Sequence, residues 1–505
     1  MTIGERSITI LPEPMLEFGY QQQIEDPRNG LFLFGPIADR KPPAIRLGAI
    51  GTPSGLSILR DWLDSANRFI PAITEGSAHQ FAFPGFEAAF RTRWSNKPAV
   101  EIAVSSADVA NTIRKSDRYQ AIYETVSLFE RPIKRHLRED DSQVDIWFVV
   151  VPDEVWRLGR PLSRVSRSEA IYSRPSLGPR VARRLFREPS LFSEEMDAAE
   201  VYRYELNFHH QLKARLVRSR AVIQVVREST LSGGSSNEDL HRRRLQDPAT
   251  VAWNLGTTTF FKSGGRPWKL ANVRDGVCYI GLVFKMNTAD PTKGNACCGA
   301  QMFLDSGDGL VFKGAMGPWY SSQTREFHLP RDEAKNLISR LFDSYVQEHK
   351  REPRELFIHG KTRFSNEEWD GFRSGVPSHV NLVGVRIIRS NEMKLFGPGS
   401  LPVIRGSCYR LSRNRALLWT TGYIPQLDTY PGREVPNPLL VEVCRGEADL
   451  DEVLKDVLGL TKVNFNSCLF ADGLPVTLRF ADAVGEVLTA APMNQEAPLP
   501  FRYYI

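Results

Sequence analysis

The sequence lacks the features that mark a secreted, zinc-binding or membrane-spanning protein. Its six cysteines form no Cys-x-x-Cys pair and stand at no metal-ligand spacing with a histidine, so they predict neither a disulfide framework nor a structural zinc site. No apolar run approaches the roughly 18 residues of a membrane span, and the start, MTIGERSITILPEP, lacks the basic and apolar regions of a signal peptide. We therefore expect a cytoplasmic protein that does not enter a membrane.

Acidic residues are scarce in one long stretch. Between Arg157 and Arg187 there are nine arginines and a single acid, Glu169. Such a run is either solvated surface or a place that holds phosphate groups. Over all 505 residues, Lys and Arg outnumber Asp and Glu by 65 to 59, a formal net charge of +6. This balance permits a polyanionic partner without requiring one.

Strands alternate with helices in the first half of the chain. The segments IRLGAIG, VEIAV and VDIWFVVV have the composition of buried parallel strands, and amphipathic helices over LSILRDWLDSANRFI and 118–137 lie between them. This order predicts a doubly wound, Rossmann-like α/β layer with ligands at the carboxyl ends of its strands. Residues 1–44 differ: PEPMLEFG, DPRNG and GLFLFGP predict strands and turns laid across a neighbouring domain.

The pattern changes after the polar stretch LSGGSSNEDLHRRRLQDP. VCYIGLVFK predicts a strand, 298–317 a β-hairpin with Asp308-Gly309 at its turn, and 331–349 a helix, before the strands ELFIHGK and VNLVGVRIIRS. A hairpin followed by αβ units is typical of an RNase H-like layer. We expect three parts: an N-terminal segment (1–44), a Rossmann-like domain (45–240) with an arginine-rich insertion (157–200), and an RNase H-like domain (241–505).

One predicted helix carries two candidate cation donors. If 207–218 is helical, His209 and Lys213 project from one face because they are four residues apart, and His210 lies three residues before Lys213. Their side chains would converge on one point. The alternative is a lysine that is simply solvated.

A strand and a turn further along could complete an anion pocket. Gln224 is the single polar side chain within the apolar strand predicted over 221–226, so it needs a hydrogen-bond partner. Lys262 directly precedes Ser263-Gly264-Gly265, a turn whose backbone N–H groups can approach a ligand closely. The alternative is a glutamine paired inside the fold.

The order and spacing of several segments resemble short prokaryotic Argonautes, which consist of a MID and a PIWI domain. These segments are PEPMLEFG, GLFLFGP, FPGF, the helix with Lys213, the strand with Gln224, WNLGTTTFFKSGGRPWKL and VCYIGLVF. FKSGGRPWKL is the most specific of them, and the resemblance covers essentially the whole chain. It implies a Rossmann-like MID domain followed by an RNase H-like PIWI domain.

The resemblance implies a role for the candidate pocket. In such proteins the MID domain holds the 5′-phosphate and first base of a guide strand, and the matching positions here are His209, Lys213, Gln224, Asn254 and Lys262. His209 stands where many relatives have tyrosine, so it can stack on the first base and adds a positive charge if it is protonated. The C-terminal carboxylate, here that of Ile505, would help to hold a Mg²⁺ ion at the guide phosphate.

The resemblance also implies where cleavage chemistry would lie. Cleavage by this fold uses a set of carboxylates that hold two Mg²⁺ ions. Val283 stands where the first Asp belongs, Gly360 lies where the next strand should end in a carboxylate, and Asp482 alone matches the last position. One carboxylate cannot hold two hard cations, so we expect no intrinsic cleavage and expect Asp482 to be a helix-start or surface residue.

The resemblance thus implies a programmable binder. A guide RNA would pair with a single-stranded DNA target while lysines and arginines contact the phosphates. The output would come from a partner chain that joins an APAZ segment to a SIR2, TIR or nuclease effector. Target binding would shift the assembly of this heterodimer, towards higher oligomers, and release the effector's activity in defence.

Two alternatives stay open from the sequence. The first is an active Mg²⁺-dependent nuclease whose carboxylates lie elsewhere, for example at Asp305, Asp308 or Glu326. The second is a plain nucleotide-binding α/β protein in which the Rossmann-like layer holds a small phosphate ligand.

Overall fold

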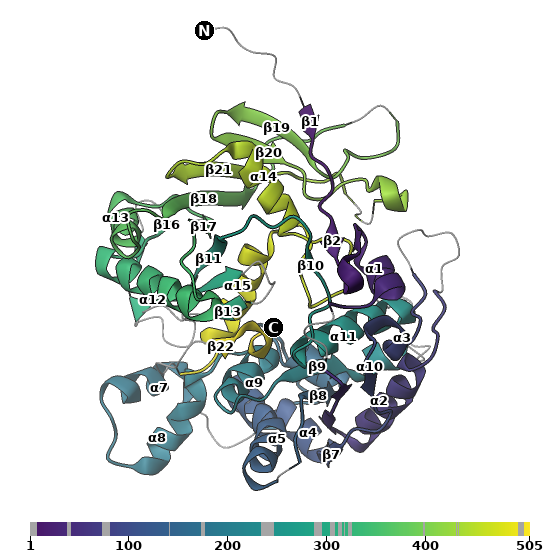
Figure 1. Ribbon diagram of the computed structural model, residues 1–505. Coiled ribbons are helices and arrows are strands. Elements are labelled where there is room, and N and C mark those ends of the chain that lie inside the picture. Colours follow the sequence, from purple (N-terminus) through teal and green to yellow (C-terminus); the bar gives the residue numbers. More distant parts are fainter. Residues whose placement is uncertain are drawn as a thin grey trace.

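Two large β-sheets organise the chain in the computed structural model (Figure 1). A four-stranded sheet is built from the first half of the sequence and an eleven-stranded sheet mainly from the second half. The structure describes residues 8–492 and 499–505, apart from the internal positions 38–41, 73–80, 141, 173–176, 234–246, 287–294, 304–308, 312–315, 318, 322–325, 397–398, 431 and 433.

The smaller sheet is fully parallel, as the sequence predicts for a Rossmann-like layer. Its strand order is β7–β5–β8–β9, with β5 at Leu47–Gly51, β7 at Val100–Ala103, β8 at Ile146–Val151 and β9 at Ile223–Arg227. Every residue of β8 is buried, because helices cover both faces of the sheet. Phe148 and Val150 belong to the core on one face, and Trp147 and Val149 to the core on the other.

Most helices of this half begin at a side chain that caps free backbone N–H groups. The cap residues are Thr52, Ser105, Asp117, Asn207 and Asp247. The helices are α2 (Pro53–Ala66), α3 (Phe86–Phe90), α4 (Ser106–Ile113), α5 (Arg118–Glu139), α6 (Asp153–Leu158), α9 (Phe208–Val217), α10 (Glu228–Leu231) and α11 (Pro248–Lys262). The two helices predicted over 118–137 and 207–218 are therefore confirmed as α5 and α9.

The arginine-rich segment contains a helical hairpin that projects from this half (Figure 1, lower left). It consists of α7 (Gly178–Arg187), α8 (Ser193–Glu200) and the 3₁₀ helix η3 (Val201–Arg203). The rings of Tyr119 on α5 and Tyr202 on η3 lie 4.9 Å apart, and the Tyr202 hydroxyl donates to Asp117 at 2.5 Å. The hairpin is thus anchored on the first turn of α5.

The larger sheet has the RNase H-like arrangement at its centre. Strands β11 (Val277–Met286), β12 (Asn295–Phe303) and β13 (Gly309–Val311) pair antiparallel, while β17 (Glu355–Gly360) and β18 (Asn381–Arg389) run parallel to β11. This confirms the predicted hairpin of β12 and β13, although Asp308 at its turn lies outside the described residues. The sheet continues through β21 (Leu439–Arg445), β20 (Arg415–Leu418) and β19 (Ser407–Ser412) to β1 (Ile8–Ile10).

Helices cover both faces of this sheet. On one face lie α12 (Arg331–His349) and α13 (Asn366–Ser374), and on the other α14 (Leu450–Gly459) and α15 (Val476–Leu488). The predicted helix over 331–349 is confirmed. Gly281 lets α15 lie directly on β11, because a Cβ there would come within 2.0 Å of the Thr477 carbonyl oxygen.

Small paired strands tie the remaining segments together. They are β2 (Leu16–Glu17), β3 (Gln23–Ile24), β4 (Ala44–Ile45), β6 (Arg93–Trp94), β10 (Lys269–Leu270), β14 (Met316–Gly317), β15 (Tyr320–Ser321) and β16 (Glu326–Phe327). Strand β2 pairs with β10, so the N-terminal segment contacts the connection between the two sheets.

The prediction of strands and turns alone for residues 1–44 is wrong at 27–34. Those residues form helix α1 (Pro27–Phe34). The Asp26 carboxylate accepts hydrogen bonds from the backbone N–H groups of Arg28 and Asn29, both at 2.9 Å, and Pro27 supplies the fixed φ of a first helical residue. The letters DPRNG therefore mark a helix start and not a turn.

Candidate nucleic-acid interface

Helix α9 carries His209 and Lys213, and Lys213 lies beside the end of the chain. Asn207 caps the helix by accepting a hydrogen bond from the His210 N–H at 3.2 Å. Lys213 is buried, and its ammonium group donates to the backbone carbonyl of Tyr504 at 3.4 Å. Lys213 thus has a partner that the spacing on α9 could not show, the C-terminal segment, while the convergence of its side chain with His209 stays a prediction.

Lys262 lies at the end of α11 and reaches the strand that carries Gln224. Its ammonium group donates to the Ile223 carbonyl at 2.9 Å and to the side-chain oxygen of Gln224 at 2.8 Å. The amide nitrogen of Gln224 donates to the Val225 carbonyl at 3.3 Å. The structure thus joins Lys262 and Gln224, which stand far apart in sequence, and it also gives Gln224 the internal partner that the alternative interpretation required.

These two lysines are buried among carbonyl and amide oxygens. Burial lowers the pKa of Lys213 from 10.5 to about 7. Burial and the charge of Lys213 also hold the pKa of Lys262 well below its usual value. A buried ammonium group that gains a bound anion recovers the electrostatic energy lost on desolvation. An anionic ligand would therefore stabilise the charged form of both lysines.

The surroundings of His209 disfavour its protonated form. Burial lowers its pKa well below 6.5, and the charges of Lys213, His210, Lys262 and Arg160 lower it further. A protonated His209 beside a bound phosphate stays a prediction, because a neighbouring anion would raise this pKa again. A neutral imidazole can still stack on a base and accept or donate one hydrogen bond.

The C-terminal segment enters this region from the other sheet. Strand β22 (Leu499–Pro500) pairs with β13, and η6 (Phe501–Tyr503) then leads to the buried Ile505. Figure 1 shows the C-terminus lying next to α9. A Cβ on Gly264, whose φ is +97°, would lie 3.2 Å from an Arg502 guanidinium nitrogen. The glycine turn after Lys262 and the tail are thus in contact.

Asn254 is not brought to the pocket. It lies about two helical turns before Lys262 on α11. Its side-chain oxygen accepts a hydrogen bond from the backbone N–H of Cys468 at 2.9 Å. In this structure Asn254 fastens α11 to the segment after α14, so the role implied for it by the resemblance stays a prediction without a geometric contact.

A cavity of about 380 Å³ adjoins His209. Its lining includes Trp156, Arg160 and Asn207. The Arg160 guanidinium stacks over the Trp156 ring at 4.1 Å, and the Arg227 guanidinium lies 5.2 Å from the same ring. The sequence interpretation missed this aromatic and cationic wall. The sequence feature that could have indicated this wall is the pair Trp156 and Arg160, which stand four residues apart shortly after a buried strand.

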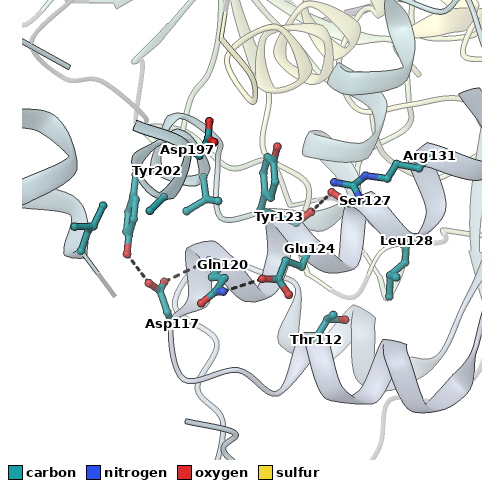
Figure 2. Close-up of a pocket in the computed structure, with 13 residues that line it drawn as sticks. Thr112, Asp117, Gln120, Tyr123, Glu124, Ser127, Leu128, Arg131, Asp197 and Tyr202 are labelled. Carbon is teal, nitrogen blue, oxygen red and sulfur yellow. Dashed lines mark hydrogen bonds between the residues drawn. The ribbon is translucent and has the colours of Figure 1, made fainter. Parts of the chain in front are cut away.

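A larger cavity, of about 650 Å³, lies between α5 and the helical hairpin (Figure 2). Its charged lining is mainly acidic, with Asp117, Glu124 and Asp197 against Arg131. Gln120 donates to Glu124 at 2.8 Å, and Tyr202 donates to Asp117. Carboxylates repel phosphate, so this cavity is not a second candidate for the guide end.

The position predicted for cleavage carries lysines. Val283 is buried on β11, and two residues later Lys285 points its ammonium group towards α15, 3.6 Å from Asp482 and 3.4 Å from Glu486. Lys361 follows Gly360 at the end of β17 and forms an ion pair with Asp482. Asp482 lies within α15 and not at its start, so the expectation of a helix-start residue is wrong. The Asp482 side chain is partly exposed, which agrees only in part with the expectation of a surface residue.

Neighbouring histidines do not restore a metal site. His359 is buried on β17 and shares a hydrogen bond of 2.9 Å with Thr477, and burial lowers its pKa to about 3. In the described part of the chain, no group of three or more His, Cys, Asp or Glu residues could hold a metal ion. Of the alternative carboxylates, Glu326 lies 3.4 Å from His328, while Asp305 and Asp308 fall outside the described residues.

His210 lies between the pocket beside α9 and the position where cleavage chemistry was expected. His210 on α9 lies 3.2 Å from Glu205 and 3.3 Å from Glu486 of α15. Glu486 also contacts Lys285. A chain of polar contacts therefore runs from His210 on α9 through Glu486 to Lys285 near the end of β11.

The fold is that of the MID–PIWI portion of Argonaute. Clostridium butyricum Argonaute bound to a guide DNA and a 19-mer target DNA aligns with a TM-score of 0.60 and 15% identity, over 96% of this chain and 53% of that one. Drosophila Piwi gives 0.58 and 12%, over 98% and 56%. A. aeolicus Argonaute gives 0.54 and 13%, over 98% and 54%.

The likeness is one of fold, because the sequence identities are low. The chain spans about half the length of these solved structures. No protein-family profile matches the chain, and no curated protein matches it. Among the described helices, none is long and apolar enough to cross a membrane.

Proposed function

We propose that this chain is a guide-directed nucleic-acid-binding protein that recognises a target without cutting it. The observation that carries the proposal is the pair of buried ammonium groups, Lys213 and Lys262, with pKa values depressed by burial beside the chain's own C-terminus. A 5′-phosphate would supply the negative charge that neither lysine has among its hydrogen-bond partners. In the proposal, the guide is a 5′-phosphorylated RNA and the target a complementary single-stranded DNA.

A Mg²⁺ ion at the guide phosphate is part of the proposal. Mg²⁺ is commonly held by one or two carboxylates together with substrate phosphates and water. Here the Ile505 carboxylate would be the protein ligand, because the hydrogen bond from Lys213 to the Tyr504 carbonyl brings the end of the chain to the candidate pocket. The ion would neutralise part of the charge that the phosphate brings to the tail.

The absence of cleavage is proposed from the lysines near Val283 and Gly360. The ammonium groups of Lys285 and Lys361 contact Asp482, the carboxylate that matches a catalytic position. An ammonium group there neutralises the carboxylate and competes for the place of a divalent cation. Recognition without cutting then needs a second chain for its output, and we propose an APAZ-effector partner of SIR2, TIR or nuclease type that forms a heterodimer, and higher oligomers on target binding, in a defence system.

The direct test is to purify the protein from cells and sequence the nucleic acid that comes with it. The proposal predicts a population of short RNAs with 5′-phosphates. Recovery of a mononucleotide or another small phosphate compound in place of RNA would contradict it and support the small-ligand alternative. Mg²⁺-dependent cutting of a guide-paired target by the purified chain would instead establish the nuclease alternative.

A further inference from the structure

Both ring nitrogens of His210 face a carboxylate. His210 lies on α9 in the smaller-sheet half, and its Nδ1 atom is 3.2 Å from Glu205 in the segment before that helix. Its Nε2 atom is 3.3 Å from Glu486 on α15, a helix that covers the larger sheet. The His210 side chain is 18% exposed, so water shields these contacts only in part. The ring thus stands between two acids, one from each half of the molecule.

This geometry suits an imidazole that carries two protons. A neutral imidazole has one N–H group, and its other nitrogen has a lone pair. Whichever nitrogen lacks the proton would point its lone pair at a carboxylate oxygen, so that contact would be repulsive. The imidazolium ion has an N–H group on each nitrogen and is therefore the one form that is attracted to both carboxylates.

The adjacent histidine has the opposite surroundings. The ring centroids of His209 and His210 lie 5.7 Å apart. Burial lowers the pKa of His209, and the charges of Lys213 and His210 lower it further. A charge on His209 is thus opposed by its surroundings, whereas His210 has a carboxylate at each ring nitrogen. Of the two neighbouring imidazoles, His210 is therefore the one that is placed to carry a charge.

Glu486 is shared between His210 and a second cation. Lys285 of β11 lies 3.4 Å from the Glu486 carboxylate. Glu486 therefore keeps a cationic partner when His210 is neutral. The remaining charged groups around this contact come from three elements: Lys213 on α9, Arg160 in the cavity that His210 also lines, and Asp482 on α15, 3.6 Å from Lys285.

Further hydrogen bonds join the α9 region to the end of α15. The backbone N–H of Glu205 donates to the Ala490 carbonyl at 3.0 Å, and the Arg218 guanidinium donates to the Pro492 carbonyl at 2.8 Å. Neither bond depends on the charge of an imidazole. The charge of His210 therefore changes how firmly α9 is held against α15, while the two halves stay joined.

We propose that His210 is a positioning residue whose second proton fixes α9 against α15. With both nitrogens protonated, the ring bridges Glu205 and Glu486. When one proton leaves, one of the two contacts becomes repulsive. The bridge is therefore present at low pH and is lost as pH rises through the range in which imidazoles titrate. The bridge itself needs no guide, whereas its effect on guide loading rests on the proposed function, because α9 also carries His209 and Lys213.

Hydrogen exchange tests the bridge in the protein without a guide. The backbone N–H of Glu205 donates across the contact to Ala490, so its exchange rate reports how firmly the two halves are joined there. The variants are His210→Gln, Glu486→Gln and the two combined. In the matched control, His379→Gln removes an imidazole from an exposed pair with Glu352. Each variant is compared with the wild type at the same pH, because the pKa of Lys213 is about 7 and its charge also changes.

At pH 6, exchange at Glu205 should be about fivefold faster in His210→Gln and in Glu486→Gln than in the wild type, as for the loss of one partly exposed ion pair. The combined variant should exchange no faster than either single variant, because both substitutions remove the same contact. At pH 8 the His210→Gln protein should match the wild type, and the control should match it at both pH values. Equal exchange at pH 6, or a His210→Gln effect of the same size at pH 8, would overturn the proposal.

Guide loading gives a second measurement with a separate outcome. His210→Gln should weaken binding of a 5′-phosphorylated RNA at pH 6 and leave it unchanged at pH 8, while His379→Gln should change neither. A loss of equal size at both pH values would show that His210 is only a packing residue and would contradict the proposal. If the wild-type protein binds no RNA, the proposed function fails, and the exchange rates at Glu205 still decide whether His210 forms the bridge.

Discussion

Lys213 and Lys262 differ from surface lysines in their surroundings. Each is buried and donates to backbone carbonyl oxygens, and Lys262 also donates to the Gln224 side chain. These contacts orient the ammonium groups without supplying a negative charge. In the proposed function, the 5′-phosphate of the guide supplies this negative charge.

Replacing both lysines should abolish most guide loading. Lys213→Met together with Lys262→Met removes two charge-assisted contacts, each worth roughly 1.5–3 kcal/mol. Binding of a 5′-phosphorylated RNA, measured by fluorescence anisotropy, should fall by about a hundredfold or more. The control Lys335→Met with Lys455→Met changes two exposed lysines and should bind as wild type does. Equal loading of both variants would remove the pocket assignment.

Loading should also depend on pH with a defined sign. Burial holds the pKa of Lys213 at about 7, whereas a bound dianion would raise it. Binding above pH 7 therefore takes up protons, and affinity should fall as pH rises from 7.5 to 9. Calorimetry in buffers of different ionisation enthalpy measures this uptake. A guide with a 5′-hydroxyl should show little of it, and proton release on loading would contradict the account.

The lowered pKa of Lys213 also affects the stability of the protein without a guide. The folded pKa of Lys213 lies below the unfolded value of 10.5, so between about pH 7 and 10.5 the unfolded chain binds more protons. In this window the contribution of Lys213 makes stability rise with pH. The two effects have opposite directions: guide affinity falls while the unloaded protein becomes more stable.

The N-terminal segment is fixed to the larger-sheet half by buried ions. Glu13 lies 3.0 Å from Arg405 and 2.8 Å from Lys462, all three buried or nearly so. Burial alone would raise the pKa of Glu13, but the charges and hydrogen bonds of Arg405 and Lys462 lower it overall. Its stabilising contribution is therefore present at neutral pH and is lost as pH falls through the lowered pKa.

Glu13→Gln should destabilise the protein by roughly 3 kcal/mol, because it leaves two buried cations without their carboxylate. Urea denaturation at pH 7 measures the change. The exposed pair of Glu452 and Lys455 gives the matched control, since Glu452→Gln should have almost no effect. Equal stability of the two variants would show that the network is not a strong attachment.

Elements with strong periodicity could be predicted from the sequence, and those that depend on a single cap residue were harder. Helices α5 and α12 carry long amphipathic patterns and were found where expected. Helix α1 is short, and its start signal, Asp26 followed by Pro27, is shared with turns. The hydrogen bonds to the Asp26 carboxylate distinguish a helix start from a turn, and they form only in the folded chain.

Contacts between distant residues were the least predictable part of the site. The spacing on α9 placed His209 and Lys213 together, but no pattern could show that Tyr504 meets Lys213 or that Lys361 meets Asp482. Asn254 shows the reverse: its position on α11 is as expected, yet its side chain is directed to the Cys468 backbone. Sequence gives the residue type and the element, whereas packing decides which side chains meet.

At the scale of the whole molecule, the two sheets meet at α9, α15 and the C-terminal segment. His210 of α9 contacts Glu486 of α15, and the tail that pairs with β13 ends beside Lys213. A ligand at Lys213 and a strand lying along the end of β11 would therefore act on neighbouring elements. The proposed function uses this arrangement: one end of a guide is held at α9 and the rest is available for pairing.

One measurement tests guide-directed binding without cleavage most directly. The purified protein is loaded with an RNA guide that carries either a 5′-phosphate or a 5′-hydroxyl, and a labelled complementary single-stranded DNA is then added in the presence of Mg²⁺. The account predicts that the phosphorylated guide alone supports tight retention of the DNA, and that the DNA is recovered at full length. Retention that does not depend on the guide, or recovery of a cut DNA, would contradict it.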